Sequence, residues 1–210
     1  MSKKQKQKTY CIKMILLGES GVGKTNLINV YLDKMFNPNE NITFKSNESY
    51  KKIDMGNNIK FNISIWDTVG QEQYRSISRH FIRDSNIVLF VYDITSRETF
   101  LELNYWISTV NEELNSDEVI LAVVANKIDL FLKSEVDRKE GEEYAKKKNA
   151  LFCETSAKED AKGFKNFIQK LLEKLVSNQK ILDNFEEVKD SRLILRKGSK
   201  NQKGDKKCCG

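Results

Sequence analysis

Apolar runs of strand length alternate along this chain with segments that carry a helical pattern. The strand-like runs cover 10–17, 86–94, 119–125 and 150–154, and their nearly continuous apolar character is typical of strands buried on both faces. Helical patterns cover 25–35, 137–148 and 164–176, and the capping-box pair Thr95 and Glu98 predicts a further helix with Thr95 as its N-cap. This alternation predicts an α/β fold with a doubly wound, mostly parallel sheet and helices on both faces.

Residues 46–66 carry a different pattern. Two extended segments, 46–55 and 59–66, flank the turn cluster Gly56-Asn57-Asn58. In the second segment Phe61, Ile63 and Ile65 alternate with polar residues, which predicts an antiparallel hairpin with one covered face. We therefore expect a six-stranded sheet with one antiparallel edge strand.

The folded unit is expected to span 10–178, between a basic, flexible N-terminus (1–9) and a basic, flexible tail (179–210). A chain of 210 residues suffices for one domain that buries roughly 70% of the surface of its unfolded chain. No apolar run approaches the roughly 20 residues that span a bilayer, and the first eight residues lack the apolar segment of a secretion signal. We expect a protein that is made and kept in the cytosol.

The net charge of +6 lies at the two ends of the chain. Residues 1–8 contain four lysines and no acid, and residues 189–210 carry a net charge of +6, which leaves the rest of the chain at −4. A nucleic-acid-binding protein is expected to carry positive charge on its folded surface. Basic tails beside a mildly acidic domain instead favour an anionic membrane surface, and we expect no nucleic acid partner.

Four cysteines fall into two groups. Cys11 and Cys153 lie in apolar, strand-like runs and are expected to be small buried thiols in a reducing compartment. Cys208 and Cys209 are adjacent, in a polar segment that offers them nothing to pack against.

Residues 18–25 (Gly-Glu-Ser-Gly-Val-Gly-Lys-Thr) follow an apolar strand and open a helix. The glycines allow a tight loop whose backbone N–H groups turn inward, and the helix N-terminus faces the same point. Lys24 is expected to reach the β- and γ-phosphates of a nucleotide, and the Thr25 hydroxyl to bind a bridging Mg²⁺. An ordinary glycine turn is the alternative, but every position of the pattern is matched, so we expect a triphosphate here.

Candidate residues for the phosphate end follow the strand at 59–66. Asp67 is placed to hold Mg²⁺ through water, and Gly70 to offer a backbone N–H to the γ-phosphate. Gln71, the next residue, is a neutral group that can orient a water molecule.

Candidate residues for a base follow two later strands. The pattern Asn126-Lys127-x-Asp129 offers a carboxylate to the two N–H donors of guanine, which adenine does not present in that arrangement. The run at 156–158 (Ser-Ala-Lys) is placed to close over the base with a backbone amide to the guanine O6, and Phe36 to stack on it edge-on. Each signal is weak alone, but together they occur in order and at strand ends.

With these motifs the chain resembles a Ras-superfamily small GTPase, and more closely a Rab. The resemblance covers about residues 10–176 and rests on 18–25, Thr43, 66–72 (Trp-Asp-Thr-Val-Gly-Gln-Glu), 126–129 and 156–158. The likeness to Rabs rests on Trp66, on 74–77 (Tyr-Arg-Ser-Ile), on 91–95 (Val-Tyr-Asp-Ile-Thr) and on the ending Cys-Cys-Gly.

The resemblance implies a P-loop GTPase fold and a GDP/GTP-cycling switch of membrane trafficking. It also implies slow GTP hydrolysis, with Gln71, Lys24 and Gly70 as the catalytic residues. The implied binding residues are the following: for phosphates Ser20, Gly21, Val22, Gly23, Lys24, Thr25, Asn26, Thr43 and Gly70; for guanine Phe36, Asn126, Lys127, Asp129, Ser156, Ala157 and Lys158; for Mg²⁺ Thr25, Thr43 and Asp67; and, as geranylgeranyl attachment sites, Cys208 and Cys209.

The implied partners are those of a Rab cycle: GTP and GDP, an exchange factor, a GTPase-activating protein, effectors, a prenylation escort and a GDP-dissociation inhibitor. The implied location is the cytoplasmic face of an intracellular membrane, in exchange with the cytosol. Attachment there is expected to depend on the lipid groups.

Two segments depart from the usual Rab pattern. Residues 44–45 (Phe-Lys) stand where Ile-Gly usually follows the switch threonine, and 81–84 (Phe-Ile-Arg-Asp) stand in place of Tyr-Tyr-Arg-Gly. The nucleotide motifs are untouched, so the departures bear on effector choice. His80, the only histidine, is expected to be a surface residue.

Three other functions compete with this interpretation. A P-loop kinase would need an acceptor site and a lid, and it would leave the pattern at 126–129 without a role. A nucleotide-binding adaptor that does not hydrolyse GTP is disfavoured by Gln71. A nucleic-acid role would rest on the charge of the tails alone.

Overall fold

The computed structural model describes residues 7–40, 43, 46–68, 75–115, 118–178 and 182, with the backbone alone described at 75–78. Its elements are β1 (Lys8–Leu17), α1 (Lys24–Tyr31), β2 (Asn47–Gly56), β3 (Ile59–Asp67), α2 (Arg75–Ile82), β4 (Ile87–Asp93), α3 (Arg97–Leu101), α4 (Leu103–Glu113), β5 (Ile120–Asn126), the 3-10 helix η2 (Ile128–Lys133), α5 (Arg138–Lys147), β6 (Leu151–Glu154) and α6 (Ala161–Ser177).

The sheet has six strands in the order β2-β3-β1-β4-β5-β6. All neighbouring strands are parallel except β2 and β3, which form an antiparallel hairpin at one edge. Both turn residues of this hairpin have positive φ, 48° at Asn57 and 63° at Asn58, as tight hairpin turns require. The predicted fold class and the antiparallel edge strand are confirmed.

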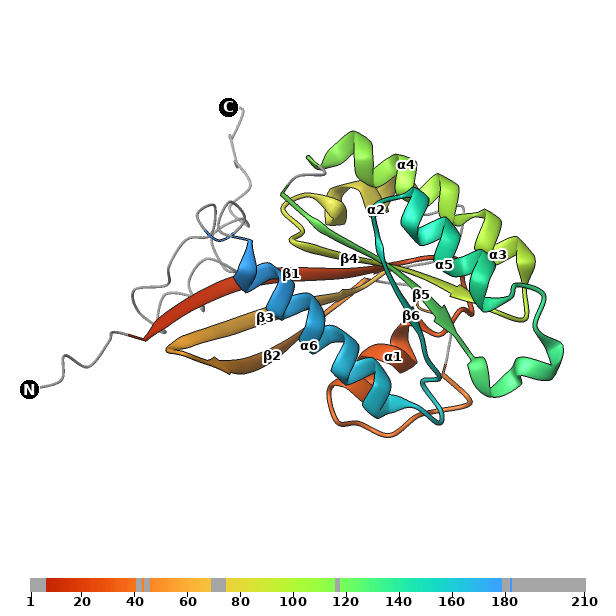
Figure 1. The fold of residues 1–210 in the computed structure, drawn as a ribbon, viewed down its shortest axis with the longest axis horizontal. Coiled ribbons are helices and arrows are strands. Elements are labelled where there is room, and N and C mark those ends of the chain that lie inside the picture. Colours follow the sequence, from red (N-terminus) through yellow and green to blue (C-terminus); the bar gives the residue numbers. More distant parts are fainter. Residues whose placement is uncertain are drawn as a thin grey trace, which may run out of the picture.

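Helices cover both faces of the sheet (Figure 1). On one face α1 and α6 pack against Ile12, Met14 and Leu16 of β1. On the other face lie α2, α3, α4 and α5, and the intervening residues Ile15 and Leu17 point into that core. The alternation of successive residues between two cores explains the continuous apolar runs of the central strands. Among the described residues, no helix is both long and apolar enough to cross a bilayer.

The first half of β1 departs from the expectation of a strand buried on both faces. Pairing with β4 starts only at Met14, so residues 8–12 extend past β4 and pair with β3 alone. Tyr10 and Ile12 face the core formed with α6, whereas Cys11 points to the opposite side and is exposed. The expected burial of Cys11 is therefore wrong, and that of Cys153 is confirmed.

The helix after β4 begins one residue later than predicted. Its N-cap is Ser96, and no side-chain capping bond is formed there by the described residues. Thr95 instead donates its hydroxyl to Asp93 Oδ1 at 2.7 Å. The predicted capping box is wrong because the preceding strand offers a carboxylate that binds Thr95 more directly. The helix is also interrupted, so that α3 ends at Leu101 and α4 begins at Leu103.

Helix α1 is shorter than its predicted range of 25–35. It ends at Tyr31, and Asp33 adopts a left-handed backbone with φ 64°. The Asp33 carboxylate binds Lys51 of β2 at 3.0 Å and Lys165 of α6 at 2.6 Å. These two ion pairs fix the point at which the chain leaves α1.

Native-state alkylation distinguishes the two thiols of the domain. Burial raises the pKa of the Cys153 thiol to about 12, helped by Asp160 and Glu154, whereas Cys11 is exposed. Because the thiolate is the reactive form, iodoacetamide at pH 8 is expected to modify Cys11 at least ~10-fold faster than Cys153. Peptide mass mapping measures each site separately. In strong denaturant the two rates should converge, and equal rates in the native protein would contradict the fold described for β1 and β6.

Candidate nucleotide-binding site

The loop between β1 and α1 approaches the backbone of β4 and a side chain of β5 so closely that only glycine fits. Gly18 has φ 147°, and a Cβ there would collide with the Val91 carbonyl of β4. Gly23 has φ 98°, and a Cβ there would collide with the Asn126 carboxamide of β5. The loop is therefore held against the carboxyl ends of β4 and β5, where open α/β sheets place their ligands.

The N-terminus of α1 is open to an anion. Gly23 is its N-cap, no described side chain caps the helix there, and the first turn contains no acidic residue. The first N–H groups of a helix have no partner within the helix, and the helix dipole places partial positive charge at the same end. Together they form a site that suits a phosphate group.

Lys24 lies beneath this loop, with 6% of its surface exposed. Its ammonium donates hydrogen bonds to the carbonyls of Gly18 at 2.7 Å and Glu19 at 2.8 Å. Burial lowers the pKa of Lys24 to about 8, although the charges of Asp67 and Glu19 act in the opposite direction. An anionic ligand beside the ammonium would favour its charged form.

Three oxygen-bearing side chains meet beside the loop. The Thr25 hydroxyl donates to Asp67 Oδ2 at 2.7 Å and lies 3.0 Å from the Thr43 hydroxyl. The Thr43 hydroxyl in turn lies 3.4 Å from Asp67 Oδ2. Thr43 belongs to neither a helix nor a strand, so these contacts join the segment after α1 to the end of β3.

The residues at this junction fit Mg²⁺. Asp67 Oδ1 is buried and has no hydrogen-bond partner among the described residues. Burial raises the pKa of the Asp67 carboxyl, while hydrogen bonds from Thr25 and Thr43 and the charge of Lys24 lower it. A cation would stabilise the ionised form, and a site with one carboxylate and two hydroxyls is typical of Mg²⁺ that completes its coordination with phosphate oxygens and water.

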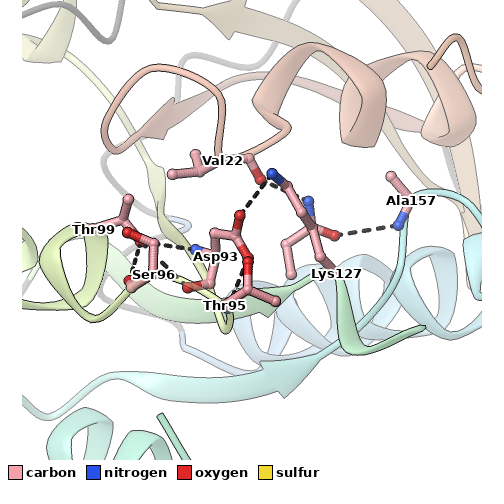
Figure 2. A network of polar contacts seen from close by, with 8 residues as sticks. Val22, Asp93, Thr95, Ser96, Thr99, Lys127 and Ala157 are labelled. Atoms are coloured by element: carbon pink, nitrogen blue, oxygen red, sulfur yellow. Dashed lines mark hydrogen bonds and ion pairs between the residues drawn. The ribbon is translucent and has the colours of Figure 1, made fainter. Parts of the chain in front are cut away.

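Asn126 is one of the residues predicted for the base end of the site, but its side chain joins loops of the protein. Its carboxamide N–H donates to the Val22 carbonyl at 2.8 Å, and its oxygen accepts from the Ala157 N–H at 3.2 Å. Val22 and Ala157, the two partners in these bonds, are labelled in Figure 2. Only 1% of Asn126 is exposed. Its two hydrogen bonds hold together the loop between β1 and α1, here called the phosphate loop, and the loop after β6.

Asp129 is oriented by the loop that follows β6. Its Oδ1 accepts the Ser156 hydroxyl at 2.6 Å. The same hydroxyl oxygen accepts the backbone N–H groups of Lys158 at 3.2 Å and Glu159 at 3.0 Å. These bonds fix one carboxylate oxygen and leave Asp129 at the wall of the pocket.

All described candidate residues except Val22 and Asp67 line one pocket of about 460 Å³. It is lined by Ser20, Gly21, Gly23, Lys24, Thr25, Asn26, Phe36, Pro38, Glu40, Thr43, Thr68, Asn126, Lys127, Asp129, Leu130, Ser156, Ala157 and Lys158. Val22 contributes its carbonyl to Asn126 while its side chain packs in the core. Gly70, Gln71, Cys208 and Cys209 lie outside the described residues.

The sequence analysis missed four residues of the pocket wall: Pro38, Glu40, Thr68 and Leu130. Thr68 directly follows Asp67, and Leu130 directly follows Asp129. Their positions next to predicted site residues could have indicated that they line the pocket. Pro38 and Glu40 lie in the loop after α1, which Asn26 holds in place by bonds to both the N–H and the carbonyl of Asn37. No local sequence pattern indicates that contact.

His80 is exposed, as expected.

A glycine loop between the first strand and first helix of a largely parallel sheet, with a lysine, two threonines and an aspartate around it, defines a P-loop nucleotide-binding protein. A profile of the Ras family matches residues 13–177. The chain is 36% identical to Ras-related protein Rab-2B of Dictyostelium discoideum over 178 residues, which are 83% of this chain and 87% of that protein.

Two further relatives agree. Ras-related protein Rab-18 of Caenorhabditis elegans is 36% identical over 174 residues, 82% of this chain and 84% of that protein. Ras-related protein Rab-21 of Bos taurus is 34% identical over 174 residues, 83% of this chain and 77% of that protein. The chain therefore belongs to the Ras family as a Rab-type small GTPase, and it hydrolyses GTP.

Exchanging Asp129 for asparagine tests the assignment of the base end. The carboxylate is expected to accept the two N–H donors of guanine, whereas an amide would offer a donor to the carbonyl of xanthine. Asp129→Asn should lose at least ~10-fold in GDP affinity and gain affinity for xanthosine diphosphate. Competition binding measures both. Asp137→Asn, at the N-cap of α5, is the matched control. Unchanged base preference in Asp129→Asn would remove Asp129 from the guanine site.

Proposed function

We propose that this Rab-type GTPase is a switch that regulates vesicle-mediated membrane traffic and binds effectors in its GTP state. The observation that carries the proposal is the contact of Thr43 with Thr25 and Asp67. It links a loop segment to the end of the pocket where the γ-phosphate and Mg²⁺ are expected. A loop held in this way is ordered by the triphosphate and released after hydrolysis.

We assign each step of the chemistry at the phosphate end to particular groups of the protein. The Lys24 ammonium and the N–H groups at the start of α1 stabilise negative charge on the transferred phosphoryl group. When bound, Mg²⁺ supplies further positive charge to the phosphate oxygens, and Thr25, Thr43 and Asp67 would hold it. We assign the orientation of the attacking water to Gln71 and a backbone N–H for the γ-phosphate to Gly70.

We further propose that the intrinsic rate is slow and that a GTPase-activating protein raises it. None of the described residues that line the pocket is an arginine. An arginine placed on the transferred phosphoryl group contributes roughly 10³ to 10⁵ in rate, so a partner that inserts one would control the lifetime of the GTP state. An exchange factor would then be needed to release GDP from this pocket.

Effectors are expected to bind the surface beside the two segments that contain Thr43 and Gly70, here called the switch segments. The rings of Trp66 and Phe81 pack with their centroids 5.2 Å apart, and the Lys13 ammonium lies 5.2 Å from the Trp66 ring. These side chains lie between β1, β3 and α2. Residues 44–45, where the sequence departs from other Rabs, come shortly before β2 in the sequence, and this departure supports a distinct choice of effector.

Membrane attachment is proposed to depend on geranylgeranyl groups at Cys208 and Cys209. Two lipid chains give a stable anchor where one gives marginal binding, at about 0.8 kcal/mol per buried CH₂. The basic residues of 189–210 add attraction to anionic lipid near the surface. A prenylation escort and a GDP-dissociation inhibitor would shield the lipids in the cytosol, and the GTPase would act on the cytoplasmic face of an intracellular membrane.

Gln71→Leu tests the assigned hydrolytic role. Leucine has a similar size but cannot hydrogen-bond water, so hydrolysis of bound GTP should slow by about 10-fold or more while GTP binding is retained. Single-turnover hydrolysis and nucleotide titration measure the two properties. Gln169→Leu, on α6 and outside the pocket, is the matched control. An unchanged single-turnover rate in Gln71→Leu would mean that another group positions the water.

Replacement of both Cys208 and Cys209 by serine tests the proposed anchor. Loss of both lipid sites should move the protein from the membrane pellet to the soluble fraction, with GTP binding unchanged, because charge alone holds it weakly. Cys11→Ser provides the control for replacing an exposed thiol in the domain. If the double variant still sediments with membranes, the lipid-anchor proposal is wrong.

A further inference from the structure

Asp93 is a buried acid that the chemistry described above does not use. It is the last residue of β4, with 7% of its surface exposed, and it pairs in the sheet with Asn126, the last residue of β5. It therefore lies beside the base end of the pocket without lining it. A charged residue is rarely buried unless it is paired, so its partners indicate its role.

Asp93 is fixed by its own turn. Its Oδ1 accepts the backbone N–H of Thr95 at 2.9 Å and the Thr95 hydroxyl at 2.7 Å. Its backbone N–H donates to the Thr99 hydroxyl oxygen at 3.1 Å, and the Thr99 hydroxyl donates to the Ser96 carbonyl at 2.8 Å. Figure 2 shows this cluster on the α3 side of Asp93. The carboxylate consequently has one orientation, with Oδ2 turned away from the cluster.

The free end of the carboxylate points at Lys127. Asp93 Oδ2 lies 2.7 Å from the Lys127 ammonium, and Lys127 lines the nucleotide pocket. In Figure 2 Asp93 stands between Thr95 and Lys127. Only 10% of the Asp93 side chain and 32% of the Lys127 side chain are exposed, so solvent screens this pair less than a surface pair.

The backbone conformation at Lys127 explains how this ion pair bears on the position of Asp129. Lys127 has φ 67°, a left-handed conformation that costs a non-glycine residue free energy and persists only where the surroundings hold it. It is the N-cap of η2, and its carbonyl accepts the N–H of Leu130 at 2.9 Å. The turn at Lys127 therefore sets the position of Asp129, two residues further on. An ion pair that holds Lys127 also holds the loop that carries Asp129.

We propose that Asp93 is a positioning residue for the base end of the nucleotide site. Through Lys127 it keeps the loop at 127–130 against the bound base and slows dissociation of the nucleotide. This inference rests on the proposed assignment of Lys127 and Asp129 to guanine binding. Asp93 itself does not touch the nucleotide, and its contribution is the fixed geometry of the residues that do.

Asp93→Asn tests the inference because asparagine keeps the shape and the acceptor for Thr95 but removes the charge. Dissociation of a fluorescent GDP analogue is expected to be about 10-fold faster than in the wild type. The control is Glu140→Gln, which breaks the ion pair of Arg97 with Glu140, a pair whose side chains are 49% and 35% exposed and outside the pocket. That variant should dissociate GDP at the wild-type rate even if its melting temperature falls.

A double-mutant cycle separates positioning from general stability. In a Lys127→Met background the pair is already absent, so adding Asp93→Asn should change the dissociation rate by less than about twofold. If the two effects instead multiply, Asp93 acts independently of Lys127 and the inference is overturned. Wild-type dissociation in Asp93→Asn, in a protein that binds GDP tightly, overturns it as well.

Two further outcomes keep the test decisive. If Asp93→Asn does not fold, Thr95→Val removes one of the bonds that orient the carboxylate, and dissociation should then be about threefold faster. An unchanged rate in Thr95→Val overturns the inference in that case. If Asp129→Asn leaves base preference unchanged in a protein that binds GDP, the guanine assignment fails instead, which is distinguishable because Asp93 is then intact.

Discussion

A buried carboxamide at the end of β5 couples the two ends of the nucleotide site. Asn126 donates to Val22 of the phosphate loop and accepts from Ala157 of the loop after β6. It also lies so close to Gly23 that the loop tolerates no side chain there. An unsatisfied buried polar group costs about 1–3 kcal/mol. Movement of either loop would break a bond of Asn126, so the phosphate and base ends keep a fixed relation.

Electrostatics at the phosphate end make the folded protein favour its ligands. Burial lowers the pKa of Lys24 to about 8 and raises the pKa of Asp67, so both groups are held where their charged forms are disfavoured. A phosphate beside Lys24 and a cation beside Asp67 would relieve both effects. The threonine hydroxyls of residues 25 and 43 are already gathered on the same carboxylate. Ligand binding and the position of Thr43 would thereby be coupled through one buried acid.

The sequence predicts the strands, the two-faced core and most of the pocket because these depend on periodicity and on motifs at strand ends. Three of the misses have non-local causes. Cys11 is exposed because β4 begins only opposite Met14, a matter of strand register. Helix α1 ends early because Lys51 and Lys165, distant in sequence, bind Asp33. Glu40 enters the pocket wall through a loop whose path no local pattern specifies.

Strand β4 sets the distance between the two ends of the site. Every residue of β4 is buried, and the strand pairs with β1 on one side and β5 on the other, so it cannot shift along the sheet. Its Val91 carbonyl packs against Gly18 of the phosphate loop, and Asp93, roughly 6–7 Å further along the strand, binds Lys127 of the base loop. The phosphates and the base of a nucleotide are joined through one ribose, which limits how far apart they can lie. A strand paired on both edges that contacts both loops therefore keeps the two loops at a fixed separation, and the proposed role of the Asp93–Lys127 pair extends this order to the loop that carries Asp129.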